Sequence, residues 1–176
     1  NHSNILVAHK LPSGVKAAVY FTDHEVVGPS IPHVILRPRN IVLGIGAKCG
    51  ASFSNLLGAL DKLLLETKLS KNSIRGIATI DIKREETCIL ELGKLLKVPI
   101  HYFTARELAA VEGKFPSSAF VKKTVGVGSV ARPSGFLASS FGEEQSYYKG
   151  DGITLAIYKG GSYELDKSGG HWPRKQ

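Results

Sequence analysis

The sequence lacks the features that assign many proteins to a class at once. No apolar run is long enough to span a membrane or to form the core of a signal peptide, since the longest are Ile41–Ile45 and Ile153–Tyr158. The two cysteines, Cys49 and Cys88, lie far apart and form no CxxC pair, so neither a zinc site nor a redox pair is indicated. We therefore expect a cytoplasmic protein with reduced thiols and no metal site of its own.

Methionine is absent as well, even at position 1 of the 176 residues. Two explanations stay open: the chain is a fragment of a longer protein, or methionines are missing from the sequence and some spacings are shorter than the true ones. The remaining composition is that of a globular domain, with 43% hydrophobic and 22% charged residues. Disorder, collagen and a disulfide-rich scaffold are not indicated.

The charge is unbalanced but spread along the chain. A net charge of +8 favours an anionic partner. No arginine-rich arm, recognition helix or RNA-binding set of aromatic residues accompanies the basic residues, so a nucleic acid is not the expected partner.

Strands and helices are expected to alternate from residue 41 onwards. Before it, one apolar run, Val15–Phe21, is followed by three prolines, which indicates a strand and a linker. The later strands are expected at Ile41–Ile45, Gly76–Ile80, Pro99–Phe103 and Ile153–Tyr158, the last at or near the sheet edge. Helices are expected after Ser52, over 85–96 and 104–111, and near 118–123 and 130–140. This alternation predicts a three-layer α/β/α sandwich around a mainly parallel sheet, with a mixed sheet left open.

Ligands of such sheets bind beyond the carboxyl ends of the parallel strands, where three loops are expected. The first loop, residues 46–52, offers backbone amides at a helix N-terminus and the cation of Lys48, which suit a carboxylate or a phosphate. The glycine spacing fits neither a dinucleotide loop nor a P-loop. These glycines can equally serve only to turn the strand into the helix.

The second loop places Thr79, Asp81, Lys83, Glu85 and Glu86 within eight residues. A carboxylate at a strand end can act as a general base, which makes Asp81 and Glu86 the candidates. The alternatives are an ion pair between Asp81 and Lys83, and first-turn acids that complement a helix dipole. The third loop, at Thr104 and Glu107, has the sequence of a capping box.

Four ordered segments of the chain together resemble the C-terminal domain shared by the CbiG and CobE proteins of cobalamin biosynthesis. They are Gly44–Ser52, Ala78–Lys83 with Glu86, Phe103–Leu108 and Val125–Ala131. Two departures stand out: the first segment has Ala47-Lys48-Cys49 where the family usually has a cysteine and two arginines, and Arg132 stands where an acidic residue is usual. On this resemblance, residues 41–158 form that domain, 1–40 a linker or remnant of the CbiG middle region, and 159–176 a polar tail.

The resemblance implies an activity in the anaerobic cobalamin pathway. A cobalt-precorrin-5A hydrolase opens the ring-A lactone of its macrocycle and releases acetaldehyde; the cobalt belongs to the substrate, and no cofactor is expected. Asp81 and Glu86 would be catalytic. The residues expected to bind substrate are Gly44, Gly46, Lys48, Gly50, Ser52, Thr79, Lys83, Thr104, Glu107 and Ser129.

The expected partners are an anionic corrinoid intermediate and the N-terminal CbiG domain or other enzymes of the pathway. Whether this chain is catalytic without that N-terminal domain is left open by the sequence. The first alternative is a non-catalytic corrinoid-binding module like CobE, and the second is a domain that binds a phosphate ligand at the glycine loop.

Overall fold

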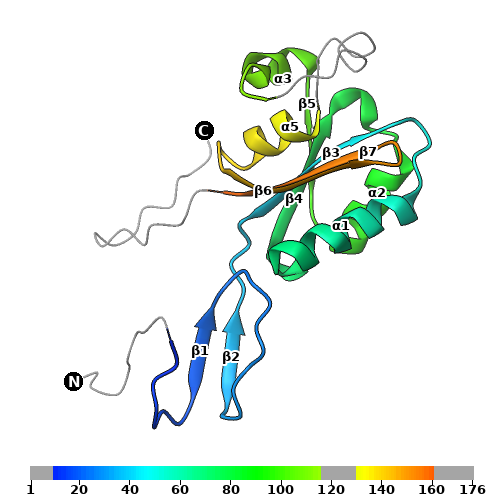
Figure 1. The fold of residues 1–176 in the computed structure, drawn as a ribbon. Helices are drawn as coiled ribbons and strands as arrows, with labels where there is room; N and C mark the ends of the chain where they lie inside the picture. The colour runs from blue at the N-terminus through cyan, green and yellow to red at the C-terminus, as the bar shows by residue number, and fades with distance from the viewer. Residues whose placement is uncertain (1–9, 116–129, 161–176) are drawn as a thin grey trace.

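A five-stranded mixed sheet forms the centre of the molecule in a computed structural model, which describes residues 10–115 and 130–160 (Figure 1). The strand order is β5-β4-β3-β7-β6. Three strands are parallel: β3 (Ile41–Ala47), β4 (Ile74–Ile80) and β5 (Ile100–Phe103). The other two, β7 (Ile153–Lys159) and β6 (Glu143–Gly150), form a hairpin whose β7 pairs antiparallel with β3.

Helices cover both faces of the sheet, which gives the expected α/β sandwich. One face carries α1 (Phe53–Thr67) and α2 (Thr87–Leu96), and the other carries α3 (Ala105–Glu112) and α5 (Ala131–Ala138) (Figure 1). Two short 3₁₀ turns, η1 (Lys71–Ser73) and η2 (Asp81–Lys83), lie before and after β4. No helix in the described ranges is long and apolar enough to cross a membrane.

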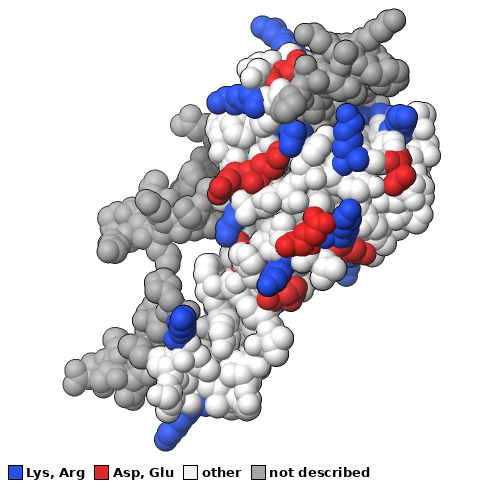
Figure 2. Space-filling view, in the orientation of Figure 1, with Lys and Arg blue, Asp and Glu red and all other residues white. Residues whose placement is uncertain are grey.

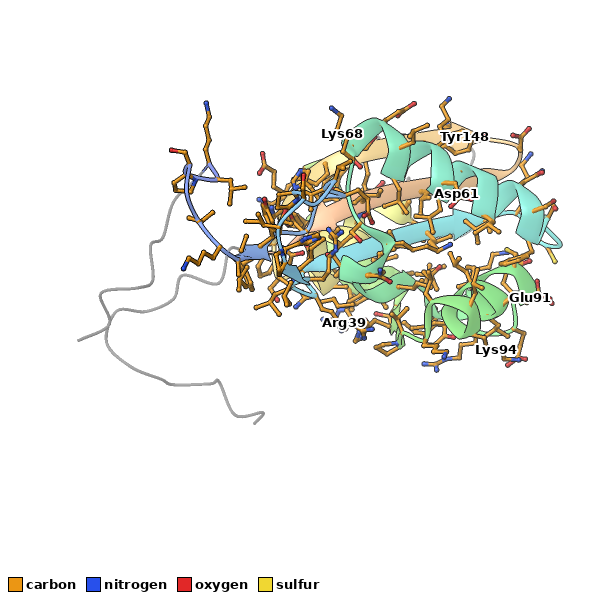
Figure 3. All side chains as sticks on the ribbon, turned by 90° about the horizontal axis from the view of Figure 1, so that it is seen from below. Arg39, Asp61, Lys68, Glu91, Lys94 and Tyr148 are labelled. Atoms are coloured by element: carbon orange, nitrogen blue, oxygen red, sulfur yellow. The ribbon has the colours of Figure 1, made fainter. Side chains whose placement is uncertain are left out.

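The largest core cluster lies between the sheet and the α1–α2 layer. Alternate residues of β3 are completely buried there because successive side chains of a strand point to opposite faces. From α1 they meet Leu56, Leu60 and Leu63, which recur at helical spacing. Figure 3 looks onto this layer, with the labelled Glu91 and Lys94 on the outer side of α2.

The strands and helices expected from the sequence in the described ranges are present, with two additions: strand β6 and a second strand before residue 41. Strand β6 was not expected, because the residues from Glu143 to Lys149 are mostly polar and lack an apolar alternation. Its pairing with β7 places Ile153–Tyr158 second from the edge and extends that strand to Lys159. The short helix expected near 118–123 lies outside the described residues.

Helix α5 packs unusually close to the middle of the sheet. A Cβ atom at Gly44 would overlap the carbonyl oxygen of Ala131, and one at Gly46 would lie 2.5 Å from Oγ1 of Thr154. Glycines at these positions therefore let the helix backbone and a neighbouring side chain approach β3.

Residues before β3 form a two-stranded parallel ribbon, here called the arm. Its strands are β1 (Ala18–Phe21) and β2 (His33–Leu36), and it projects from the domain at the start of β3 (Figure 1). The segment expected to be a strand and a linker thus contains two paired strands.

One buried carboxylate fastens the arm to the domain. Asp23, which follows β1, is 5% exposed and accepts a hydrogen bond of 2.8 Å from Nδ2 of Asn40. It also forms an ion pair of 2.6 Å with Nζ of Lys159 at the end of β7. Burial alone would raise the pKa of Asp23, but the hydrogen bonds from Lys159 and Asn40 hold it below its ordinary value.

The attachment of the arm is expected to weaken at acid pH. Because the pKa of Asp23 is lower in the folded protein, its ionised form contributes stability above its unfolded pKa of about 3.8. That contribution is lost as the pH falls below this value through the folded pKa. Asp23→Asn should cost on the order of 1–2 kcal/mol at pH 7, since Lys159 is partly exposed. Urea unfolding of both proteins should show this difference shrinking towards pH 3; a constant difference would contradict it.

Candidate functional site

Three loops meet at one end of the sheet because β3, β4 and β5 run in the same direction. The first loop follows Ala47, the second begins at Asp81 and the third is Thr104. The sequence predicted this shared rim, and it is the candidate site.

The first loop is a tight turn braced by the β6–β7 hairpin. Gly50 has a φ of +70°, which favours glycine, and Ala51 N–H donates to the carbonyl of Lys48 at 3.1 Å. Lys48 N–H donates to the carbonyl of Gly152 at 2.8 Å, while its side chain is exposed. Ser52 occupies the N-cap position of α1, but its hydroxyl bonds to the hydroxyl of Ser54 instead of capping the helix. Among the described residues the Lys48 ammonium group thus has no partner, and it lies beside a backbone held by hydrogen bonds.

Glu86 joins the first two loops across the rim. Its Oε1 accepts the Gly50 N–H at 3.0 Å, and its Oε2 pairs with Nζ of Lys83 at 2.9 Å. The side chain is 7% exposed, so both oxygens are used inside the protein. Of the two carboxylates predicted to be catalytic, Glu86 is placed to hold the loops in position; a catalytic role for it stays a prediction.

Asp81, like the exposed Glu85 of the same loop, has no side-chain partner among the described residues. It begins η2 directly after β4 and is partly exposed. The alternative pairing of Asp81 with Lys83 is not formed, because Lys83 pairs with Glu86. Asp81 is therefore free to contact a water molecule or a ligand.

The other predicted ligand contacts differ in how accessible they are. Thr79 is fully buried in β4 and its hydroxyl has no hydrogen-bond partner in the described ranges. Gly44 is buried beneath α5, whereas Gly46 is partly exposed. Ser129 lies outside the described residues. The structure brings the first two loops together and leaves the binding roles of these residues as predictions.

The third loop uses its polar groups to start α3. Thr104 Oγ1 accepts the Glu107 N–H at 3.3 Å, and Glu107 accepts the Thr104 N–H at 2.7 Å, which is the expected capping box. The hydrogen bonds from the backbone and hydroxyl of Thr104 lower the pKa of Glu107. Both side chains are thereby engaged in the helix cap.

A second polar cluster, which the sequence did not indicate, lies between α5 and β6. Arg132 forms a two-pronged contact with Glu144 at 2.9 and 3.0 Å and lies 3.9 Å from the ring centre of Tyr147. Tyr158 donates its hydroxyl to the same carboxylate at 3.0 Å. Burial and the charge of Glu144 raise the pKa of Tyr158. Because Arg132 is already paired, it does not offer a free charge to an anion. The sequence did not indicate this pairing, because Glu144 lies in β6, a strand that was not expected.

The buried thiol is not placed for chemistry at this rim. Cys88 is buried, and burial together with the charge of Glu86 raises its pKa, which disfavours a reactive thiolate. Residues 10–115 and 130–160 contain no group of three His, Cys, Asp or Glu side chains that could hold a metal ion.

The domain that carries this rim matches a known family. The family model described as cobalamin synthesis G C-terminus matches residues 41–158. The chain belongs to this family. Its domain is thus the C-terminal domain shared by CbiG and CobE, and the family acts in cobalamin synthesis.

Curated relatives of the domain carry the same name in several organisms. Cobalt-precorrin-5A hydrolase of Salmonella typhimurium is 34% identical over 127 residues, covering 72% of this chain and 36% of the relative. The probable cobalt-precorrin-5A hydrolase of Methanocaldococcus jannaschii is 28% identical over 156 residues, covering 82% and 47%. The chain thus spans about a third to a half of the length of these relatives.

Solved structures share the fold. CobE, a protein from the cobalamin biosynthetic pathway, superposes with a TM-score of 0.63 and 26% identity, covering 69% of this chain and 91% of CobE. A cobalamin biosynthesis protein G homologue from Sulfolobus solfataricus has a TM-score of 0.53 at 19% identity, covering 82% and 50%. The α/β fold expected from the sequence is therefore confirmed.

Substitutions at Glu86 should test whether its side chain holds the first loop in position. Glu86→Ala removes the acceptor of the Gly50 N–H and leaves Lys83 unpaired, so it should cost on the order of 3 kcal/mol. Glu86→Gln keeps an acceptor for Gly50 and should cost less. Amide exchange at Gly50 should accelerate strongly only in the alanine variant. Glu91→Gln, on the outer side of α2, is the control and should leave the exchange unchanged. If Glu86→Gln accelerated the exchange at Gly50 as much as Glu86→Ala does, the positioning role would be contradicted.

Proposed function

We propose that the chain is the C-terminal part of a cobalt-precorrin-5A hydrolase and that it binds the anionic macrocycle at the rim formed by the three loops. The names of the curated relatives support this activity. The observation that carries the location is the bridge from Glu86 to Gly50 and Lys83, which holds the first two loops together.

The free groups at this rim suit an anionic ligand with a hydrolysable lactone. Lys48 is exposed, and a carboxylate of the macrocycle would pair with its ammonium group. The first backbone amides of α1, which the Ser52 side chain does not cap, would add donors. A corrinoid carries several carboxylates around a flat apolar ring, so one cation and a rigid backbone would fix one edge of it.

Lactone opening needs a positioned water, a base and donors for the oxyanion. Asp81 would take the proton from the water, because it directly follows β4, has no side-chain partner among the described residues, and Glu86 is already paired. The uncapped amides at the start of α1 would stabilise the negative oxygen that forms on the lactone carbonyl. The later carbon–carbon cleavage that releases acetaldehyde would use the macrocycle as its electron sink.

The second candidate is a non-catalytic corrinoid-binding module like CobE. The specific observation in its favour is that this chain covers 91% of CobE but only about a third of the Salmonella hydrolase. In that case the rim binds the corrinoid, and no residue of this chain performs the hydrolysis.

An acetaldehyde assay with the lactone substrate tests the proposal. The intact gene product should release aldehyde, and the 176-residue chain should at least bind a corrinoid in a spectral titration. No aldehyde from the intact protein would reject the hydrolase. Corrinoid binding without aldehyde would favour the module, and binding of nucleotides alone would reject both.

A further inference from the structure

One face of the arm is a row of exposed apolar side chains. The parallel register pairs Val19 with Val34 and Phe21 with Leu36, so all four lie on the same face of the ribbon. They are 69%, 55%, 70% and 50% exposed, in that order. We call these four residues the arm patch.

An isolated ribbon of this kind is poorly stabilised by itself. Parallel strands occur almost only where both faces of a sheet are covered, and two strands alone are at best marginally stable in water. In Figure 2 the arm, below the domain, is mostly white, so few Lys, Arg, Asp or Glu side chains lie on the face in view. The arm patch therefore has the character of an interface rather than of a solvated surface.

The arm is nevertheless held in a definite position. Asp23 ties it to Asn40 and Lys159, and Glu25 N–H donates to the carbonyl of Lys68 at 2.8 Å. Arg37 adds an ion pair of 2.9 Å with Glu25. These contacts fix the base of the ribbon, so its apolar face is presented in a constant direction from the domain.

The comparisons point to a longer polypeptide that could supply an occupant for the patch. The match to the Methanocaldococcus relative includes 82% of this chain, whereas residues 41–176 are 136 of 176, or 77%, so it extends into the residues before 41. About half of that relative lies outside the match, and the family description places this domain at the C-terminus. The CobE match covers 69%, about the share of the domain alone.

We propose that the arm patch is the surface on which the amino-terminal part of the intact, longer protein packs. Four partly exposed side chains offer less than the ~1,000 Å² that a stable complex of separate chains needs. They suffice for an occupant on the same polypeptide, because the covalent link keeps its effective concentration high. The inference rests on the proposed longer hydrolase chain, but it concerns docking and not chemistry.

Hydrogen exchange in the intact gene product and in the 176-residue chain tests this docking. The amides of β1 and β2 should exchange about tenfold more slowly in the intact protein, or slower still. A tenfold change is what the burial of one Val, Leu or Phe side chain would contribute. Phe21→Ser with Leu36→Ser should abolish the difference. Val27→Ser is the matched control, because Val27 is fully exposed outside the patch, and it should leave the difference unchanged.

Three results would overturn the proposal. They are equal exchange of the arm in both proteins, a gene product with no polypeptide before residue 1, and a dimer of the 176-residue chain that the double substitution dissociates. Acetaldehyde release is measured on the same samples. Slow exchange of the arm amides in an intact protein that releases no acetaldehyde would reject the hydrolase activity but support the docking. Acetaldehyde release with fast exchange of these amides would support the activity and reject the docking.

Discussion

Asp81→Asn in the intact protein is expected to lower kcat for the lactone substrate by about 10²–10⁴-fold, the range for loss of a general base. Asparagine has the size of aspartate but cannot take a proton from water. The Asp81 side chain makes no hydrogen bond or ion pair within the described residues, so the fold should not change. KM should stay within a few-fold, since Lys48 and the first amides of α1 would still hold the substrate.

Glu85→Gln is the matched control for this experiment. Glu85 is an exposed carboxylate of the same loop, so the substitution removes an equal charge from the same region. Steady-state acetaldehyde release should fall only in the Asp81 variant. A normal kcat in that variant would show that the base lies elsewhere, and a rise in KM alone would assign Asp81 to binding.

The elements that could be read from the sequence are those with a strong local pattern. Strand β3 is a short β-branched run, and α1 repeats its leucines at helical spacing, so both were predicted from neighbouring residues. Strand β6 was missed because its residues are mostly polar and its position depends on pairing with β7. The parallel pairing of β1 with β2 likewise depends on contacts distant in sequence.

The candidate site was likewise predictable only where local patterns determine it. The three loops follow from strand direction, so their meeting at one rim was predicted. The contact between Gly50 and Glu86 joins residues 36 positions apart, which no local pattern encodes. Consequently two neighbouring acids that looked equivalent, Asp81 and Glu86, have different surroundings: the first is free and the second is buried and paired.

Gly44→Ala is expected to destabilise the domain by about 3 kcal/mol and to lower Tm by roughly 10 °C. The added methyl group would overlap the carbonyl oxygen of Ala131 and crowd the backbone of Gly135, and helix α5 cannot retreat without losing its packing on β3. The obstructing atoms are backbone, so no side-chain rotation relieves the clash. Thermal unfolding followed by circular dichroism measures the effect.

Gly58→Ala is the matched control, because Gly58 lies in α1 with open space around its Cα. Alanine there should raise stability by up to about 1 kcal/mol, through its higher helix propensity. The two substitutions add the same methyl group, so the opposite signs isolate the packing of α5 on β3. If Gly44→Ala left stability unchanged but weakened corrinoid binding, Gly44 would be a ligand contact, as the sequence predicted, and not a packing residue.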